Sequence, residues 1–251
     1  MAKIHSLESS LVDQIAAGEV IDRPASVDKE LIENSLDAGS DEINVQISKG
    51  GHELIYVSDN GCGMNKEDLK SAFKRHATSK IQNLEDLNHI LTLGFRGEAL
   101  PSIASVSMFT ALSAENDTNA NELIINGGEI KSYNPATGIA GTTCKVHNLF
   151  YNTPGRRKFL KKPETEQALI NSMIRRFMLS RPDVAFKLTS NNKIIYDVPS
   201  QSLSDRINAI YGSDFKKGIL SVKMEKEPYK VSGFIGNLSL VRKRIGEQYI
   251  F

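Results

Sequence analysis

The hydrophobic positions of this chain recur with two different periods, and these periods predict helices and strands. Within residues 27–36 they fall on one side of a helix drawn at about 100° per residue. Residues 43–49 and 53–59 alternate instead, on either side of two glycines, which predicts an antiparallel hairpin. A second hairpin is predicted over 184–190 and 193–198. Further strands are expected at 105–112, 122–127, 129–133 and 142–149, and further helices at 65–75, 84–90, 164–180 and 203–211.

Capping and turn residues mark where these elements start and stop. Asp22 is placed to cap the helix that carries residues 27–36, and Gly39 is placed to end it. Gly18 is expected to stop a short helix over residues 11–17. Separated helices and hairpins of this kind predict an α+β fold, with a layer of helices on a mostly antiparallel sheet.

The stretch VPSQS, residues 198–202, has the composition of a domain edge. We therefore expect a first domain over residues 1–200 and a linker helix over 201–212. Residues 213–251 are expected to be the truncated start of a second domain, because the chain stops within the strand-like run GEQYIF.

Composition is that of a soluble globular protein, with 251 residues of which 40% are hydrophobic and 24% charged. No run approaches the roughly 18 apolar residues of a membrane span. Cys62 and Cys144 fit no metal or redox spacing, and reduced thiols are expected. Residues 151–251 hold 19 Lys and Arg against 9 Asp and Glu, a net charge of +10, and residues 1–150 hold 12 against 21, a net charge of −9. Unless folding mixes the two halves, the basic half suits a polyanion such as DNA.

One face of the predicted helix gathers polar residues within an arc of about 140°. These residues are Lys29, Glu30, Glu33, Asn34 and Asp37. Taken alone, this face is most simply the solvated side of an amphipathic helix. The alternative is a site that uses a carboxylate and a neutral amide one turn apart.

The sequence DNGCGM, residues 59–64, follows a predicted strand directly. Gly61 and Gly63 leave little side-chain bulk beside Asp59, so a planar ligand can approach the backbone closely. An ionised carboxylate only accepts hydrogen bonds, which suits the exocyclic amine of adenine and not the carbonyl of guanine. The simpler alternative is an Asp-Asn-Gly turn.

Three further stretches offer polar groups. Residues 92–106 form a glycine-bearing loop that leads into a helix, whose backbone N–H groups can hold phosphate oxygens. A P-loop is excluded, because no GxxxxGK[ST] occurs. RHATSKI, residues 75–81, places hydroxyls and a lysine on a loop that could close over an anion. Thr142 and Thr143 in GTTCKV could meet a base edge, or they could simply favour a strand.

Taken together and in this order, KELIENSLDAG, DNGCGM, GFRGEAL and GTT resemble the nucleotide-binding motifs of the Bergerat-fold ATPases. That superfamily includes gyrase B subunits, heat-shock chaperones of the ninety-kilodalton class and sensor histidine kinases. QIAAGEVIDRPAS, ENSLDAG, RHATSKI, GFRGEAL and LFYNTPGRRKFLKK are more similar still to the MutL family of mismatch repair proteins. The resemblance is dense over residues 4–160 and thinner beyond them, and it implies an ATPase domain followed by an α/β domain of the ribosomal-protein-S5-like type.

The resemblance also implies roles for individual residues, with ATP and Mg²⁺ as the cofactors. Glu30 would be the general base that activates water, and Asn34 would be the Mg²⁺ ligand. Asp59 would read adenine, and Thr78, Ser79 and Lys80 lie in the stretch that resembles the mobile ATP lid. The remaining nucleotide contacts would come from Gly61, Gly63, Met64, Gly94, Phe95, Arg96, Gly97, Glu98, Ala99, Leu100 and Thr143. Hydrolysis is expected to be slow, and the family's second-domain lysine lies beyond Phe251.

The basic cluster is the candidate DNA surface, with phosphate contacts independent of base sequence. It consists of Arg156, Arg157, Lys158, Lys161 and Lys162, supported by the arginines at 175 and 176 and the RKR run at 242–244. A solvated helix face is the alternative for each part. The resemblance implies partners as well: a mismatch-recognition protein of the MutS type, a downstream nuclease or helicase, and an ATP-dependent dimer of N-terminal halves. It places the protein in the cytoplasm at the nucleoid, or in the nucleus of a eukaryote, and not in a membrane.

Two positions depart from the family's pattern. Asp28 stands where an aliphatic residue is usual, within the apolar arc of its helix, and Gly155 stands where alanine is usual. The competing functions are a chaperone or topoisomerase that uses the same site, a sensor kinase, and a DNA-binding module with an inactive ATP site. No histidine lies in an obvious phosphoacceptor helix, which argues against the kinase.

Overall fold

The computed structural model describes residues 17–81, 83, 85–86, 89–90, 92–117, 119–241 and 248–251. Residues 11–16 of the helix predicted over 11–17, and residues 84, 87 and 88 of the one predicted over 84–90, lie outside these residues. Residues 17–20 are helical, so the predicted stop at Gly18 is wrong. A Cβ at Gly18 would lie 1.6 Å from Nη2 of Arg156. This glycine therefore gives the arginine room and does not terminate the helix.

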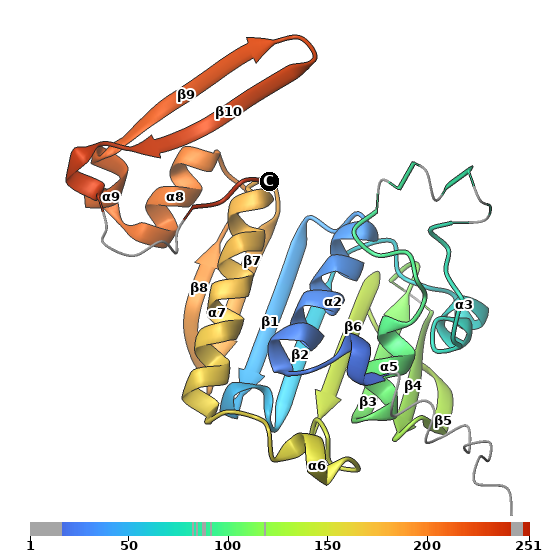
Figure 1. The fold of residues 1–251 in the computed structure, drawn as a ribbon. Helices are drawn as coiled ribbons and strands as arrows, with labels where there is room; N and C mark the ends of the chain where they lie inside the picture. The colour runs from blue at the N-terminus through green and yellow to red at the C-terminus, as the bar shows by residue number, and fades with distance from the viewer. Residues whose placement is uncertain are drawn as a thin grey trace, which may run out of the picture.

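An eight-stranded sheet forms the centre of the fold, with the strand order β5-β4-β3-β6-β2-β1-β7-β8 (Figure 1). β1 and β7 are parallel, and each of the other neighbouring pairs is antiparallel. The predicted α+β fold with a mostly antiparallel sheet is thus confirmed. The strands are β1 (Glu42–Ser48), β2 (Leu54–Asp59), β3 (Met108–Ala114), β4 (Ala120–Asn126), β5 (Glu129–Ala136), β6 (Gly141–His147), β7 (Ala185–Ser190) and β8 (Lys193–Val198).

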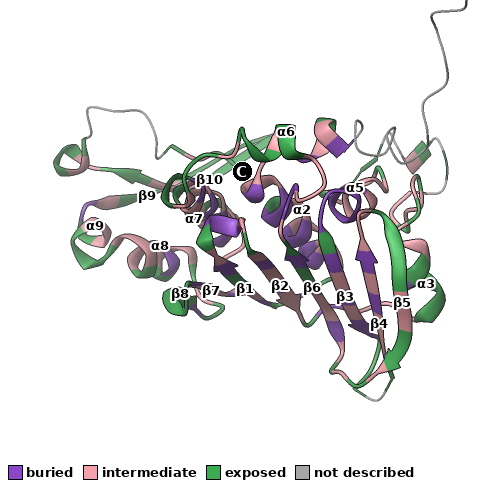
Figure 2. Cartoon of the chain, turned by 90° about the horizontal axis from the view of Figure 1, so that it is seen from below, coloured by how far each residue is buried: buried purple, intermediate pink, exposed green. Residues whose placement is uncertain are grey.

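Helices α2 (Pro24–Asp37), α5 (Ala99–Ser105) and α7 (Pro163–Ser180) cover one face of the sheet, and buried positions recur along the strands and on these helices (Figure 2). Ile43, Val45 and Ile47 alternate with more exposed residues along β1 and are no more than 2% exposed. Each such buried aliphatic side chain stabilises the fold by about 1.5–3 kcal/mol. Shorter helices are α3 (Lys66–Ser71) and α6 (Pro154–Arg157).

Local sequence explains the bounds of α2. Pro24 occupies its first turn, and Gly39 adopts a φ of 74° just beyond its end. The predicted cap at Asp22 is wrong in detail, because Arg23 takes the N-cap position while Asp22 accepts a hydrogen bond from the Ser26 hydroxyl. Asp28 is fully buried on the apolar side of the helix.

Helix α8 (Leu203–Tyr211) contacts the sheet domain through Arg206, which is 0% exposed. Its guanidinium lies 2.7–3.0 Å from four backbone carbonyl oxygens. They belong to Met178, Pro182, Val184 and Pro199. Burial lowers the pKa of Arg206. The predicted linker helix is therefore docked on the domain that it follows, and Gly212 ends it as expected.

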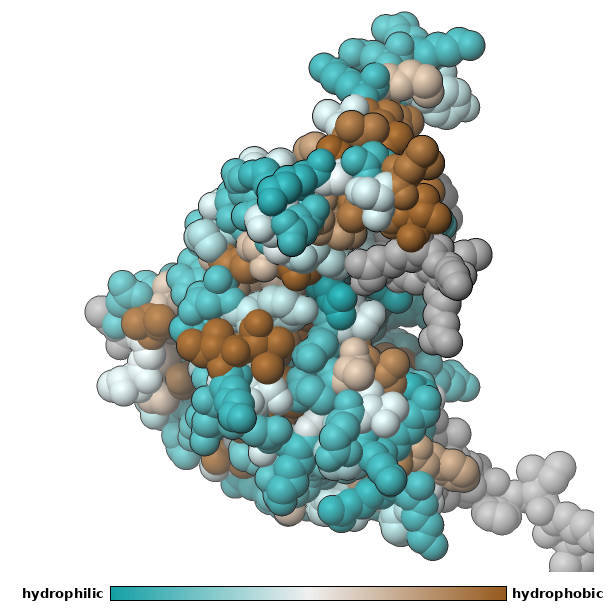
Figure 3. All heavy atoms as spheres, turned by 90° about the vertical axis from the view of Figure 1, so that its left-hand side faces the viewer, coloured by the Kyte–Doolittle hydropathy of each residue, from teal (hydrophilic) through white to brown (hydrophobic). Residues whose placement is uncertain are grey.

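Helix α8 is followed by α9 (Ser213–Lys217) and by a two-stranded antiparallel sheet of β9 (Ile219–Lys226) and β10 (Tyr229–Gly236), and two 3-10 helices are η1 (Lys49–Gly51) and η2 (Leu238–Leu240). This hairpin carries exposed hydrophobic side chains, including Met224, Tyr229 and Ile235. Figure 3 faces this side of the molecule, where hydrophobic side chains gather below the polar tip at the top of the view. Within the described residues, no helix is long and apolar enough to cross a membrane.

Candidate nucleotide-binding site

A cavity of about 1240 Å³ opens beside helix α2 and the end of strand β2. Residues 71–73, 76–80 and 92–100 form much of the rest of its wall. Of the predicted nucleotide-site residues, all but Gly61 and Thr143 line this cavity. The structure therefore brings together stretches that lie far apart in the sequence.

Asp59 is held at the end of β2 by three hydrogen-bond donors. Its Oδ2 accepts from the Ser35 hydroxyl at 2.7 Å, and its Oδ1 accepts from the backbone N–H groups of Gly61 at 2.9 Å and Thr142 at 3.2 Å. A carboxylate offers about four lone-pair sites. One acceptor site on a fixed carboxylate thus remains for a ligand donor, which fits the amine of adenine.

The prediction for Thr143 needs correction. Thr142 pairs with Asp59 across the β2–β6 ladder and lines the cavity, while Thr143 pairs with Ser58. Neighbouring residues of a strand point to opposite faces. The Thr143 hydroxyl accordingly lies 2.8 Å from the Ser58 hydroxyl and away from the cavity. Gly61 also lies outside the lining, and it contributes through its N–H bond to Asp59.

Glu30 and Asn34 both face the cavity from α2. Nζ of Lys29 lies 3.2 Å from Oε1 of Glu30 and 2.7 Å from Oε2 of Glu33. The Glu30 side chain is 24% exposed, so it can reach water, whereas Glu33 is 12% exposed. Burial raises the pKa of Glu33, against the hydrogen bond and charge of Lys29.

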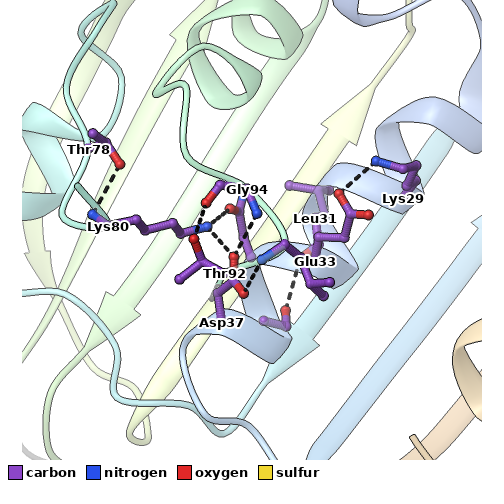
Figure 4. Close-up of polar contacts among 11 residues, drawn as sticks. Lys29, Leu31, Glu33, Asp37, Thr78, Lys80, Thr92 and Gly94 are labelled. Carbon is purple, nitrogen blue, oxygen red and sulfur yellow. Dashed lines mark hydrogen bonds and ion pairs between the residues drawn. The ribbon is translucent and has the colours of Figure 1, made fainter. Parts of the chain in front are cut away.

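Asp37 is the centre of a second polar cluster at the end of α2 (Figure 4). Its carboxylate pairs with Lys80 at 2.6 Å and accepts the backbone N–H groups of Leu93 at 2.9 Å and Gly94 at 3.1 Å. Lys80 also donates to Oδ1 of Asn34 at 2.8 Å. Sequence reasoning gave Asp37 no role and missed Ser35 as well. The signal available in the sequence was that both residues belong to ENSLDAG, where Ser35 lies one residue and Asp37 three residues after Asn34.

Two glycines of the site, Gly63 and Gly97, adopt conformations that other residues avoid. Gly63 has a φ of 64°, and a Cβ there would lie 1.9 Å from the Ala114 carbonyl oxygen. Gly97 has a φ of 62°, and its Cβ would lie 2.4 Å from the Ala77 oxygen. Both positions therefore require glycine to keep the loops beside the cavity closed on their neighbours.

The donor set fits a magnesium nucleotide better than a metal held by protein alone. Among the described residues, no group of three His, Cys, Asp or Glu side chains could hold a metal ion. Mg²⁺ is usually bound by one or two protein ligands together with phosphates and water. Asn34 Oδ1 is an oxygen of that kind. Exposed Arg96, whose guanidinium lies 5.5 Å from the Phe95 ring centre, adds positive charge to the rim.

The basic cluster divides into one inward and four outward side chains. Arg156 packs against Gly18, lies 5.5 Å from the Phe150 ring centre, and has a pKa lowered by burial. The exposed members are Arg157, Lys158, Lys161 and Lys162. Among the described residues, no carboxylate pairs with these four. Arg175 is half-buried and Arg176 exposed, and residues 242–244 lie outside the described part. At Gly155 a Cβ would meet nothing within 4 Å, so an alanine would fit.

Comparison with known proteins agrees with this arrangement. The model of the family described as "Histidine kinase-, DNA gyrase B-, and HSP90-like ATPase" matches residues 23–138. The fold and the site thus define an ATPase domain of that class.

Relatives within the class are similar over a longer stretch. The chain is 44% identical over 252 residues to the DNA mismatch repair protein MutL of Neisseria meningitidis serogroup B, and 45% identical over 253 residues to that of Clostridium perfringens. Each match covers the whole chain and 38% of the relative. A solved Aquifex aeolicus MutL ATPase domain complexed with ADP is 31% identical, with a TM-score of 0.64, over 82% of this chain and 73% of that one. The chain belongs to the MutL family of DNA mismatch repair proteins.

Proposed function

We propose that the chain binds ATP in this cavity, hydrolyses it slowly with Mg²⁺, and serves as the switch domain of a mismatch repair protein. The observation that carries the proposal is the placement of Glu30 and Asn34 one turn apart on α2, facing the same cavity as the fixed carboxylate of Asp59. The carboxylate of Asp59 is suited to a base, and the helix face that carries Glu30 and Asn34 is suited to a metal and phosphates.

The residues divide the chemistry between them. Asp59 accepts a hydrogen bond from the exocyclic amine of adenine and repels the carbonyl oxygen that guanine carries at that position. Glu30 orients a water for in-line attack and takes its proton, and Asn34 contributes an oxygen to the metal. When bound, Mg²⁺ neutralises charge on the phosphates. Residues 94–100 contribute backbone N–H groups and Arg96 contributes charge, while Thr78, Ser79 and Lys80 line the wall next to them.

DNA binding is the second part of the proposed function. The exposed cations Arg157, Lys158, Lys161 and Lys162 support a surface that follows phosphates without reading bases. Arg156 is assigned to packing, because it lies against Gly18 and Phe150. The surface lies outside the nucleotide cavity, so the two binding events can be measured separately.

The role in repair is proposed for the longer protein, because the chain spans 38% of the length of these curated relatives. ATP binding would close residues 78–80 over the nucleotide and allow two such domains to dimerise. The dimer would then pass the signal from a mismatch-recognition protein to a downstream nuclease or helicase, in the cytoplasm or nucleus.

Isothermal titration with a non-hydrolysable ATP analogue, with and without Mg²⁺, tests the nucleotide part. We expect tighter binding with the metal in the parent and no metal effect in Asn34→Ala. The control is Asn44→Ala, on β1 outside the cavity lining. A parent that binds no nucleotide would contradict the proposal. Mismatch-repair complementation by the full-length protein tests the cellular role and separates it from a chaperone or topoisomerase.

A further inference from the structure

Lys80 and Asp37 form a shielded ion pair within the cavity. Nζ of Lys80 lies 2.6 Å from Oδ2 of Asp37 and 2.8 Å from Oδ1 of Asn34. The Lys80 side chain is 20% exposed and that of Asp37 only 7%. Charge-assisted hydrogen bonds of this length are stronger than neutral ones, and burial limits their screening. The ammonium is therefore a fixed charge at the end of α2.

Asp37 is in turn fixed by the backbone of a second segment. Leu93 donates to its Oδ1 at 2.9 Å and Gly94 donates to its Oδ2 at 3.1 Å. A Cβ at Gly94 would lie 3.3 Å from Nζ of Lys80, which is tighter than an ordinary contact. The side chain of Lys80 and the backbone at 93–94 thus converge on one carboxylate (Figure 4).

Asn34 is affected directly, because its amide oxygen already accepts a hydrogen bond from a cation. An ammonium and a divalent metal on the same neutral oxygen would repel each other, and burial weakens the screening of that repulsion. Mg²⁺ also requires nearly ideal octahedral geometry, which leaves little tolerance for a second cation on its ligand.

We propose that Lys80 is a resident cation on Asn34, which holds the oxygen assigned to Mg²⁺ and gives it up when the metal and nucleotide bind. The proposal rests on the proposed function, which assigns Mg²⁺ to Asn34. Asp37 is a positioning residue that keeps the displaced ammonium beside the phosphates. Lysine and metal alternate on one oxygen, so Lys80 sets how strongly nucleotide affinity depends on Mg²⁺.

Calorimetric titration of ADP at zero and at saturating Mg²⁺ tests the proposal on the parent, Lys80→Met and Lys80→Gln. Without metal, both variants lose a cation beside the phosphates, so ADP affinity falls. With metal, affinity falls less, because Mg²⁺ no longer has to displace the lysine. The ratio of the metal-free Kd to the Kd with metal therefore rises, by about five- to tenfold or more. Lys80→Gln keeps a neutral donor in case the methionine variant does not fold.

Lys29→Met is the matched control, because it also removes one positive charge from the cavity. The native Lys29 contacts Glu30 and Glu33 and does not contact Asn34. The ratio of the Lys29→Met variant is expected to equal that of the parent. An unchanged or lower ratio in both Lys80 variants overturns the proposal, since the loss of a lysine that only contacts phosphate would weaken binding equally in both conditions. If the ADP affinity of the parent did not depend on Mg²⁺, the metal assignment in the proposed function would be overturned instead.

Discussion

The hydroxyl of Ser35 lies 2.7 Å from the carboxylate of Asp59, and this contact joins helix α2 to the end of strand β2. The same helix carries Glu30 and Asn34 on its cavity side. One hydrogen bond thus ties the residue proposed to read the base to the helix proposed to carry catalysis.

Asp59→Asn is expected to weaken ATP binding while affecting GTP little, because it replaces an ionised acceptor with a neutral amide. We expect the parent to prefer ATP over GTP by at least about tenfold, or about 1.4 kcal/mol, and the variant to lose most of that preference. Competition titrations with both nucleotides measure it. Asp41→Asn, outside the cavity lining, is the control, and equal affinities in the parent would rule out base reading.

Glu30→Ala is expected to lower the ATPase rate by about 10²–10⁴-fold, because it removes the general base, while ATP affinity stays within a few-fold. Phosphate release under single-turnover conditions, together with a binding titration, measures both quantities. Glu33→Gln alters the neighbouring carboxylate on Lys29 and is expected to hydrolyse at close to the parental rate. If Glu30→Ala turned over normally, another base would have to be sought.

Asp28 is expected to destabilise the protein at neutral pH. Both its oxygens are buried and have no hydrogen-bond partner among the described residues, and burial raises its pKa well above the usual value. A raised folded-state pKa means that the folded state binds more protons, so the free energy of unfolding falls as pH rises above the unfolded pKa of about 3.9. Asp28→Leu should therefore stabilise the protein at pH 7 by about 1–3 kcal/mol.

Denaturant unfolding at several pH values checks this expectation, and the gain should shrink towards pH 4. Asp28→Asn, which cannot ionise, should remove the same pH dependence. Asp214→Asn changes an aspartate whose side chain is 95% exposed. It should neither stabilise the protein at pH 7 nor alter the pH dependence of unfolding. A pH profile shared by the parent and Asp28→Asn would show that Asp28 does not titrate in this range.

Cys62 offers a direct probe of occupancy, because it is exposed and lines the cavity. Burial, with a smaller contribution from Asp59, raises the pKa of Cys144 far above its usual range, so that thiol should be unreactive in the folded protein. We expect saturating ADP to slow alkylation of Cys62 several-fold, as followed by mass spectrometry. As a control, Cys62→Ala should show no labelling. A rate of Cys62 alkylation that does not change with ADP would place the nucleotide outside this cavity.

The DNA surface is tested by replacing Arg157, Lys158 and Lys161 with glutamate. Affinity for unrelated DNA sequences should fall equally, and each lost phosphate contact should reduce the salt slope by about 0.7–0.9. Fluorescence titrations across salt concentrations measure both effects. Arg156→Gln serves as a comparison, with lower thermal stability expected to outweigh any change in slope. An unchanged slope in the triple variant would make this cluster a solvated surface.

Periodicity was sufficient to predict α2, both hairpins of the sheet and the antiparallel layout, because each depends on neighbours in sequence. It could not place Thr143, since alternation along a strand leaves open which of two adjacent threonines faces the site. The role of Asp37 was equally hidden, because Lys80, Leu93 and Gly94 reach it only after folding. Arg156 resembled its exposed neighbours in sequence, and its contact with Gly18 depends on tertiary packing.

The buried guanidinium of Arg206 bears on how this protein can be shortened. A fragment cut at residue 200 would retain the four carbonyl oxygens that Arg206 contacts, near the end of α7 and the start of β7, but would lose their donor. A fragment that ends after Gly212 keeps the donor and its helix. Expression trials that seek a minimal ATPase unit should therefore begin from the later end point, although the composition of residues 198–202 alone points to the earlier one.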